Sequence, residues 1–300
     1  MNRQTKRRAI LRIALAVCVV TLAVSVSMYI KYMVGSRDER ALFSELSDLR
    51  DAGLRELTDS PPTESTPDFT GEVFVDTSNS IRMIKVASTS PTIPRQDSAA
   101  PALDILPQYQ LLHERNADMI GWLTIPGTVI DYPVMQSPDA PGFYLTHDFD
   151  RRKRKSGVPF AQENCDVNAS DNIILHGHHL KDGTQFAKLL SYQKEPFYQT
   201  HQTILFDTLY EKREFVVIAA FKISGSAKDP FEYTQFVNAQ NDAEFDAFVE
   251  RCKSLAFYDT GATASYGDKL LTLSTCEYSL RDGLFVVVAK QVMLEQVVLE

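Results

Sequence analysis

A single uncharged apolar run, residues 13–30, divides this chain into two parts that fold in different surroundings. Its 18 residues reach roughly 27 Å as an α-helix, close to the hydrocarbon thickness of a membrane. Five basic residues and no acidic residue lie within residues 1–12. Because positive charge stays on the cytoplasmic side, we predict a cytoplasmic segment at 1–12 and a transmembrane anchor at 13–34, with the rest outside.

A cleaved signal peptide is the alternative interpretation of this run. The apolar core of a signal peptide is usually about 7–15 residues, shorter than the run here, but small residues near Ser25 and Ser27 keep cleavage open. Both interpretations place the remaining chain outside the cytosol.

The whole chain carries a net charge of −8 and residues 1–40 carry +6, so residues 41–300 carry −14. An acidic body argues against a nucleic-acid partner, which requires a basic face.

The segment between the apolar run and the main body, residues 35–101, predicts a helix followed by a linker. Residues 37–58 are charged, with a weak stripe of leucines, and we interpret them as a solvated stalk helix. Residues 58–101 are rich in Pro, Ser and Thr, a composition typical of a linker. One short apolar alternation, Glu72 to Asp76, is a candidate for an isolated strand.

The main body, residues 102–300, alternates short β-type runs with turn signals, a pattern typical of a barrel or a sandwich. A helix over 104–119 is expected first, interrupted early by Pro107. Two more helices are expected, over 183–192 and 242–257, and the aromatic residues of the latter indicate a core-facing side. The β-type runs are GWLTIPG, VIDYPVM, GFYLTHDF, DNIILHG, TILFDTLY, REFVVIAAFKIS, KLLTLSTC and LFVVVAKQVML.

Three of the four cysteines lie outside the apolar run, and one of them has the setting of a nucleophile. Cys252 falls on the apolar face of a predicted helix, where a thiol acts as a small hydrophobic group. Cys165 lies in a polar loop that suggests no chemistry. Cys276 ends the run KLLTLST and precedes the polar turn EYSLRDG, which predicts a partly exposed thiol on a rigid strand end. Three thiols cannot all pair, so at least one stays free or pairs between chains.

Three of the six histidines gather directly after the apolar run NIIL, at His176, His178 and His179. A polar strand end is the simplest interpretation. A metal site is a second, although the sequence offers no further cluster of ligands at a suitable spacing. The third is a Cys–His pair, in which an imidazole activates a thiolate. Spacing alone does not decide whether the two strand ends meet.

Several stretches, in order along residues 104–300, resemble the class B sortases, cysteine transpeptidases of Gram-positive bacteria. NADMIGWLTIPGTVIDYPVMQ looks like the opening helix-to-strand segment of that family, and FYLTHDFDRRKRKSG looks like its second strand and loop. DNIILHGHHLKDGTQFAKL resembles the stretch around the catalytic histidine, and TLSTCEYS resembles the cysteine signature. The resemblance implies a mainly β fold, a closed barrel of about eight strands with an N-terminal helix and a long helix inserted between two late strands.

The same resemblance assigns roles to individual residues. It implies His178 as the catalytic histidine, Cys276 as the nucleophile and Thr275 as part of the substrate groove. Class B sortases usually carry an arginine eight residues after the cysteine, where this chain has Leu284, which we include among the substrate-binding positions. Arg281, five residues after the cysteine, is the candidate to replace that arginine, or else it is a solvated turn residue.

The implied activity is transpeptidation through an acyl-enzyme thioester, without a cofactor or a metal. The implied partners are sorting-signal peptides of secreted surface proteins or pilins, an amine of a cell-wall precursor or a pilin lysine, and the membrane. An extracytoplasmic cysteine protease or hydrolase is an alternative, although the papain-type C-G-S-C-W and caspase-type Q-A-C-x-G signatures are absent. A catalytically impaired wall-binding module is a second alternative, because Leu284 occupies the usual arginine position.

Overall fold

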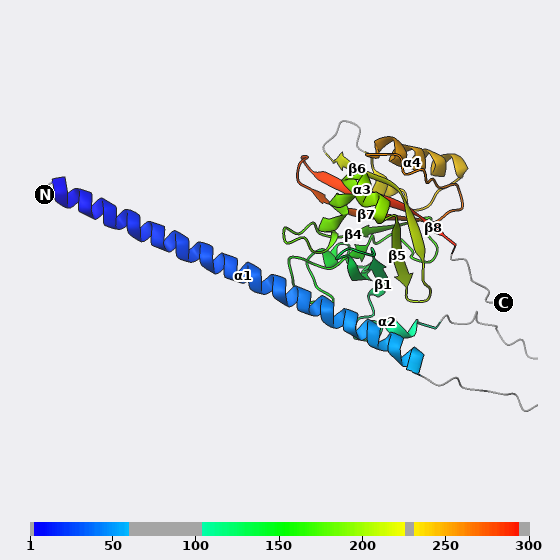
Figure 1. The fold of residues 1–300 in the computed structure, drawn as a ribbon, viewed down its shortest axis with the longest axis horizontal. Coiled ribbons are helices and arrows are strands. Elements are labelled where there is room, and N and C mark those ends of the chain that lie inside the picture. The colour runs from blue at the N-terminus through cyan, green and yellow to red at the C-terminus, as the bar shows by residue number, and fades with distance from the viewer. Residues whose placement is uncertain (1–2, 60–103, 226–230, 294–300) are drawn as a thin grey trace, which may run out of the picture.

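The computed structural model describes residues 3–59, 104–225 and 231–293. A closed β-barrel of eight strands forms its body, in the order β1-β2-β3-β4-β7-β8-β6-β5 (Figure 1). Neighbouring strands are antiparallel except for the pairs β2–β3 and β4–β7. The predicted closed barrel is thereby confirmed. The strands are β1 (Met119–Thr124), β2 (Asp131–Met135), β3 (Phe160–Ala161), β4 (Asn172–His176), β5 (Thr203–Thr208), β6 (Glu214–Ser224), β7 (Leu270–Glu277) and β8 (Gly283–Val292).

Seven of the eight predicted β-type runs contain strands, and one prediction is wrong. The run GFYLTHDF holds a 3₁₀ turn, η1 (Phe143–Leu145), instead of the second strand that the resemblance suggested. Gly142 enters this turn with φ +70°, in the left-handed region that ends an extended chain. The strand missed by the sequence is β3, Phe160–Ala161, whose two residues are too few to show an alternating pattern.

The helices around the barrel follow the sequence with two corrections. Pro107 does not interrupt a helix but begins α2 (Pro107–Arg115), the position where a missing N–H costs nothing. The expected helix over 183–192 is a 3₁₀ helix, η2 (Phe186–Gln193). The long inserted helix is confirmed as α4 (Asp242–Leu255), between β6 and β7. Two short helical elements also flank the barrel, α3 (Glu195–Thr200) and η3 (Tyr233–Gln235).

Two apolar clusters hold the body together. One fills the barrel and extends to the helices at one side, and the other lies between the barrel wall and α4. Phe245 and Phe248 of α4 are buried in the second cluster, as the sequence indicated. Figure 1 shows α4 and the N-terminal helix, α1 (Arg3–Asp59), on opposite sides of the barrel.

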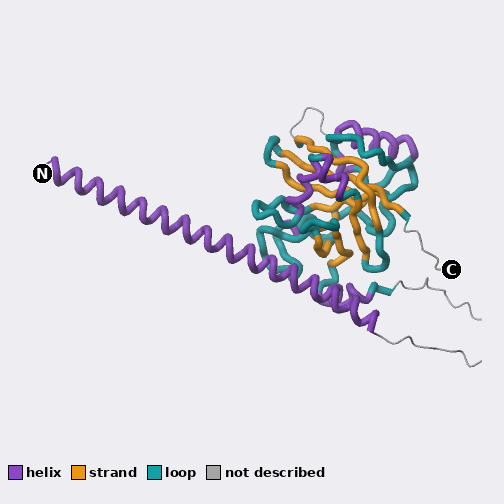
Figure 2. The backbone as a smooth tube through the Cα atoms, viewed as in Figure 1, coloured by secondary structure: helices purple, strands orange, loops and turns teal. Residues whose placement is uncertain are grey.

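The N-terminal helix, α1 (Arg3–Asp59), is continuous through the apolar run and far beyond it (Figure 2). Side chains 15–30 are exposed, and by length and composition this helix is able to cross a membrane. The expectation of a solvated helix at 37–58 is wrong, because Leu42, Phe43 and Leu46 are buried against the body. Each such side chain stabilises the contact by about 1.5–3 kcal/mol. The predicted linker and the candidate strand at 72–76 lie outside the described residues.

Polar contacts add to the docking of α1. The Arg50 guanidinium lies 2.7 Å from the carboxylate of Asp131 on β2 and covers the ring of Trp122 at 4.6 Å. The ring of Phe43 packs on Tyr132 with centroids 4.7 Å apart. The second half of α1 is therefore part of the folded body, so no flexible segment separates it from the apolar half.

Candidate active site

The strands that carry the candidate catalytic residues, β4 and β7, lie side by side and parallel. Their register runs from Asn172 opposite Leu270 to His176 opposite Ser274. Continued for two residues, this register brings His178 level with the end of β7. The two strand ends, whose meeting the sequence left open, therefore lie together, although the two segments are far apart in the chain.

Two hydrogen bonds extend the pairing beyond the last paired residues. The amide of Gly177 donates to the carbonyl of Ser274 over 3.1 Å. The hydroxyl of Thr275 donates to the carbonyl of Gly177 over 2.7 Å. Thr275 is itself buried, so its hydroxyl joins the two strand ends in this structure. A contact between Thr275 and substrate stays a prediction.

Cys276 stands where β7 leaves the core. The six preceding residues of the strand are buried, whereas the Cys276 side chain is exposed. Cys165 lies in a loop, as expected, and its side chain is buried there with its sulfur donating to the Asn172 carbonyl at 3.6 Å. Burial raises the thiol pKa of both Cys165 and Cys252. Both are therefore poor nucleophiles at neutral pH.

His178 is half-exposed on the loop that follows β4. Its Nε2 lies 2.8 Å from the carbonyl oxygen of Leu145. A carbonyl only accepts, so Nε2 carries the hydrogen, and in the neutral ring Nδ1 is left as a proton acceptor. Among the described residues the ring is hydrogen-bonded to Leu145 and not to Cys276. The pair therefore shares one level of the sheet without a direct hydrogen bond between the two side chains.

His179 and Tyr278 border the cysteine on a side that the sequence did not single out. The Nδ1 of His179 lies 3.1 Å from the backbone carbonyl of Cys276. Its ring stacks on Tyr278 with centroids 5.0 Å apart, and the Tyr278 hydroxyl donates to the His179 carbonyl over 3.2 Å. The sequence pointed to the histidine cluster and to Cys276. It did not predict the contact between His179 and Tyr278, which depends on the pairing of β4 with β7.

Leu284 and Arg281 occupy different settings, one in the sheet opposite the nucleophile and the other in the exposed turn. Leu284 is directly opposite Cys276 in the antiparallel register of β7 and β8, so the two side chains share one face. Arg281 lies in the turn between these strands, with 89% of its side chain exposed. Its carboxylate neighbour is Asp282, at 4.0 Å. The usual arginine position therefore adjoins the thiol, and the candidate replacement projects into solvent.

A second cation that sequence reasoning missed lies beside the same turn. Lys222 of β6 places its Nζ 3.1 Å from the hydroxyl of Ser279. Slight burial of Glu277 raises its carboxyl pKa, but hydrogen bonds from Ser279 and the charge of Lys222 leave this pKa below its ordinary value. The Glu277 carboxylate accepts three hydrogen bonds from Ser279 and Leu280, and these bonds fix the first residues of the turn between β7 and β8.

Tyr233 fixes the other border of the site. Its hydroxyl lies 2.6 Å from the hydroxyl of Ser274, two residues before Cys276. Burial raises the pKa of Tyr233, the bond to Ser274 opposes this, and the nearby Cys276 raises it further. The segment that leads into α4 is therefore held against β7 next to the thiol. Nothing in the local sequence of Tyr233 predicts this contact.

Comparisons with known proteins agree with this geometry. The Sortase domain family matches residues 123–292. Sortase B of Staphylococcus aureus is 35% identical over 189 residues, which cover 62% of this chain and 75% of that protein. The solved S. aureus sortase B–substrate complex has a TM-score of 0.58 and 32% identity, covering 64% of this chain and 88% of that one. A sortase B complexed with triglycine also has a TM-score of 0.58 and 32% identity, covering 64% of this chain and 89% of that one.

The barrel, the exposed cysteine at a strand end and these similarities together define the class. This chain belongs to the sortase family. Within it, the chain is a cysteine transpeptidase of class B.

Proposed function

We propose that Cys276 and His178 carry out the transpeptidation of this sortase. The observation that carries the proposal is the parallel register of β4 and β7, which brings the ends bearing these two residues to one level. A strand end gives a nucleophile a rigid base and an open approach. Cys165 and Cys252 are buried, so Cys276 is the accessible thiol of the body.

The reaction has two halves that share one pair of groups. In the first, His178 takes the thiol proton of Cys276, Sγ attacks a peptide carbonyl, the C–N bond breaks, and His178 gives that proton to the departing amine. An acyl thioester remains on the cysteine. In the second, an incoming amine attacks the thioester carbonyl, its proton passes to His178, the C–S bond breaks, and the departing sulfur of Cys276 takes the proton back from His178. The product is a new amide, and the enzyme returns to its starting state.

The negative oxygen of each tetrahedral intermediate requires donors. Arg281 takes this role in the proposal, because no other arginine follows Cys276 and its side chain is exposed at the turn beside the site. The competing arrangement leaves Arg281 in solvent and the oxyanion to backbone N–H groups. Leu284 and Thr275 border the acyl group on either side of the cysteine.

The substrates follow from the similarity to the sortase B complexes. The acyl donor is a sorting-signal peptide of a secreted surface protein or pilin, and the acceptor is an amine of a cell-wall precursor or a pilin lysine. Residues 13–34 anchor the enzyme, with residues 1–12 in the cytoplasm and the catalytic domain, 102–300, outside. The exposed, uncharged half of α1 supports this arrangement. Protease added to wall-less cells should remove the body, and its full protection would contradict the orientation.

A product analysis separates this function from its rivals. The full chain is incubated with a library of sorting-signal peptides, with and without triglycine, and the products are identified by mass spectrometry. A transpeptidase yields peptides joined to triglycine. Cleavage without any amine-linked product would instead indicate a hydrolase. No turnover, together with retained binding to cell walls, would indicate a wall-binding module.

A further inference from the structure

A pocket of about 400 Å³ lies between α1, the loop before β3 and the loop after β4, outside the site assigned above. Gly35 and Glu39 of α1 form one wall. His179 and Tyr278 form another and connect the pocket to the active site, since His179 contacts the Cys276 carbonyl. A molecule held here therefore lies beside the nucleophile.

Three cations line this pocket: Arg154, Lys155 and Lys181. Lys155 and Lys181 are exposed, and neither ammonium group forms a hydrogen bond or ion pair with any residue in the described ranges. Arg154 is half-buried, and its Nε contacts Asp148 over 3.2 Å. The Nη2 of Arg154 has no partner within the same ranges.

The two carboxylates of the pocket are already occupied by internal donors. Glu39 accepts from the side-chain amide of the buried Gln185 over 3.1 Å. Asp182 accepts from the hydroxyls of Ser36 and Thr184, each over 2.6 Å. The charged donors that remain for a ligand are therefore those of the three cations, and because they outnumber the two carboxylates in the lining, they favour an anion.

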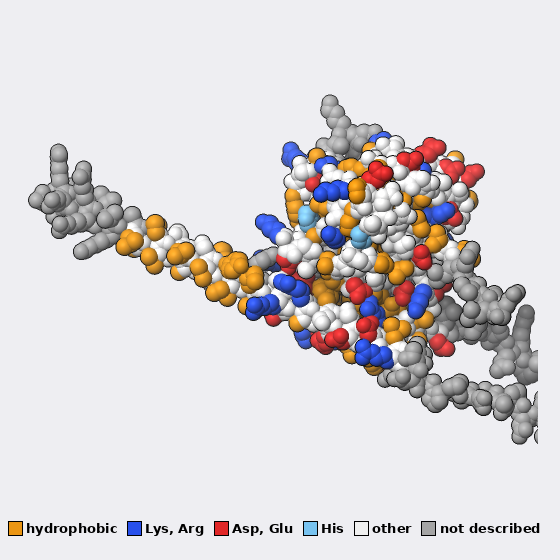
Figure 3. All heavy atoms as spheres, viewed as in Figure 1, with side chains coloured by type: hydrophobic (Ala, Val, Ile, Leu, Met, Phe, Trp, Pro, Cys, Tyr) orange, Lys and Arg blue, Asp and Glu red, His pale blue; other side chains and the backbone are white. Residues whose placement is uncertain are grey.

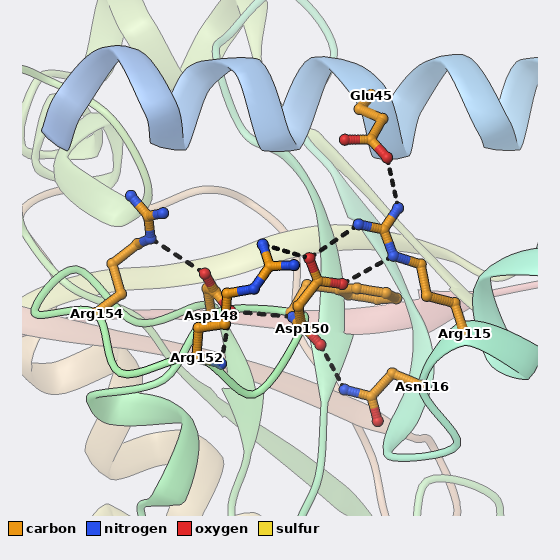
Figure 4. Close-up of polar contacts among 8 residues, drawn as sticks. Glu45, Arg115, Asn116, Asp148, Asp150, Arg152 and Arg154 are labelled. Atoms are coloured by element: carbon orange, nitrogen blue, oxygen red, sulfur yellow. Dashed lines mark hydrogen bonds and ion pairs between the residues drawn. The ribbon is translucent and has the colours of Figure 1, made fainter. Parts of the chain in front are cut away.

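Ion pairs hold the loop before β3, and Figure 4 shows those of Asp148 and Asp150 with Arg154, Arg152 and Arg115. The Asp148 carboxylate is 2% exposed and accepts from the amides at 150 and 152 as well as from Arg154. Asp150 takes two bonds from Arg115 of α2, which also reaches Glu45 of α1 at 2.7 Å. The backbone of this loop is thus fixed, so a ligand of Arg154 and Lys155 orders their side chains but not the loop that carries them.

The pocket opens where the apolar half of α1 ends. Gly35, in its wall, directly follows the proposed anchor, and its carbonyl lies 3.4 Å from Nη1 of Arg154. Figure 3 shows Lys and Arg side chains gathered where this rod of apolar side chains meets the body. The headgroups of the membrane, which carry phosphate, lie at this level.

We propose that this pocket binds a phosphate group presented at the membrane surface, with Arg154, Lys155 and Lys181 as its ligands. The phosphate belongs either to an anionic lipid headgroup or to a lipid-linked molecule that brings its amine to Cys276. Membrane proximity rests on the proposed anchor, but phosphate binding itself does not depend on the proposed chemistry.

Calorimetry with inorganic pyrophosphate tests the pocket directly. The full chain is placed in lipid nanodiscs of neutral phosphatidylcholine and titrated at low salt. The double variant Lys155→Gln/Lys181→Gln should bind pyrophosphate about tenfold more weakly or worse, because two charge-assisted contacts are lost. The matched control, Lys153→Gln/Lys194→Gln, removes two exposed lysines outside the pocket and should keep the affinity within about twofold.

A second arm identifies the source of the phosphate. In nanodiscs that contain phosphatidylglycerol, weaker pyrophosphate binding by the unmodified chain indicates that headgroups occupy the pocket. An unchanged pyrophosphate affinity indicates that lipid headgroups do not occupy the pocket and that its phosphate belongs to the lipid-linked molecule. No binding in neutral discs, or equal binding by the pocket variant, overturns the proposal. Cys276→Ala should retain pyrophosphate affinity, so a failure of the catalytic assignment remains distinguishable.

Discussion

The two strands that flank the Cys276 strand support the site in different ways. On the β4 side, five register pairs and two further hydrogen bonds hold the backbone up to Gly177, directly before His178. On the β8 side, an exposed turn carries Arg281, and Leu284 faces the thiol. The sheet thus holds the backbone next to His178, whereas the candidate cation, Arg281, lies in a surface turn outside the sheet. We infer that the backbone positions of Cys276 and His178 are preorganised and that oxyanion stabilisation is the weaker part of this enzyme.

The largest expected effect is that of Cys276→Ala, which removes the proposed nucleophile from the strand between β4 and β8. We expect kcat to fall about 10⁴-fold or more, the scale for losing a nucleophile that acts in a unit. Amine-linked product from the peptide assay is the measurement. Cys165→Ser and Cys252→Ala are the controls, and both should turn over at rates set only by their stability. Substantial turnover by folded Cys276→Ala would refute the mechanism.

His178→Ala tests the strand-end pair and should lower kcat by about 10²–10⁴-fold, the usual contribution of an acid–base group. His179→Asn is the matched control, because this imidazole bonds the Cys276 backbone and takes no part in the proposed proton transfer. It should cost about tenfold at most. The reverse order of effects would assign the chemistry to His179.

Arg281→Ala tests the turn side of the comparison. If the guanidinium reaches the oxyanion, kcat should fall by about 10²–10³-fold, the scale for one such donor. A fall below about threefold, far under that scale, would leave Arg281 in solvent. In that case Leu284→Arg should raise kcat, because position 284 faces the thiol directly. No gain would mean that the site has no room for an arginine there.

The smallest effect is expected for Thr275→Val, which keeps the shape of the side chain and removes its hydrogen bond to Gly177. We expect a loss of about 0.5–1.5 kcal/mol in unfolding free energy, the net value of one hydrogen bond. Thr275→Ser retains the bond and should restore most of the stability. Thermal unfolding measures both variants. An unchanged melting temperature in Thr275→Val would show that this bond does not hold the strand ends.

The sequence predicted the parts of this molecule whose signals are local. Alternating apolar residues located seven strands, and the helix at 242–255 followed from its spacing. The wrong strand at 142–149 came from β-forming side chains in a segment that Gly142 turns back on itself. The docked face of α1 was missed because Leu42 and Leu46 form only a weak stripe, and their partners lie far along the chain.

The candidate site was predictable in its residue types but not in its geometry. Cys276 and the histidine cluster stand out at strand ends, and the family resemblance selected His178 among them. That β4 lies next to β7 depends on a parallel pairing between distant segments, which no local pattern encodes. The contacts of Tyr233 with Ser274 and of His179 with Cys276 depend on the same pairing.

The central claim is that the acyl group passes through Cys276, and mass spectrometry of the trapped enzyme tests it most directly. The full chain is mixed with its best peptide from the library, quenched in acid during turnover, digested and mapped. The account predicts an acyl adduct on the peptide that contains Cys276, present without triglycine and lost when triglycine is added. Amine-linked product that forms without an adduct at Cys276, or with the adduct on another residue, would contradict it.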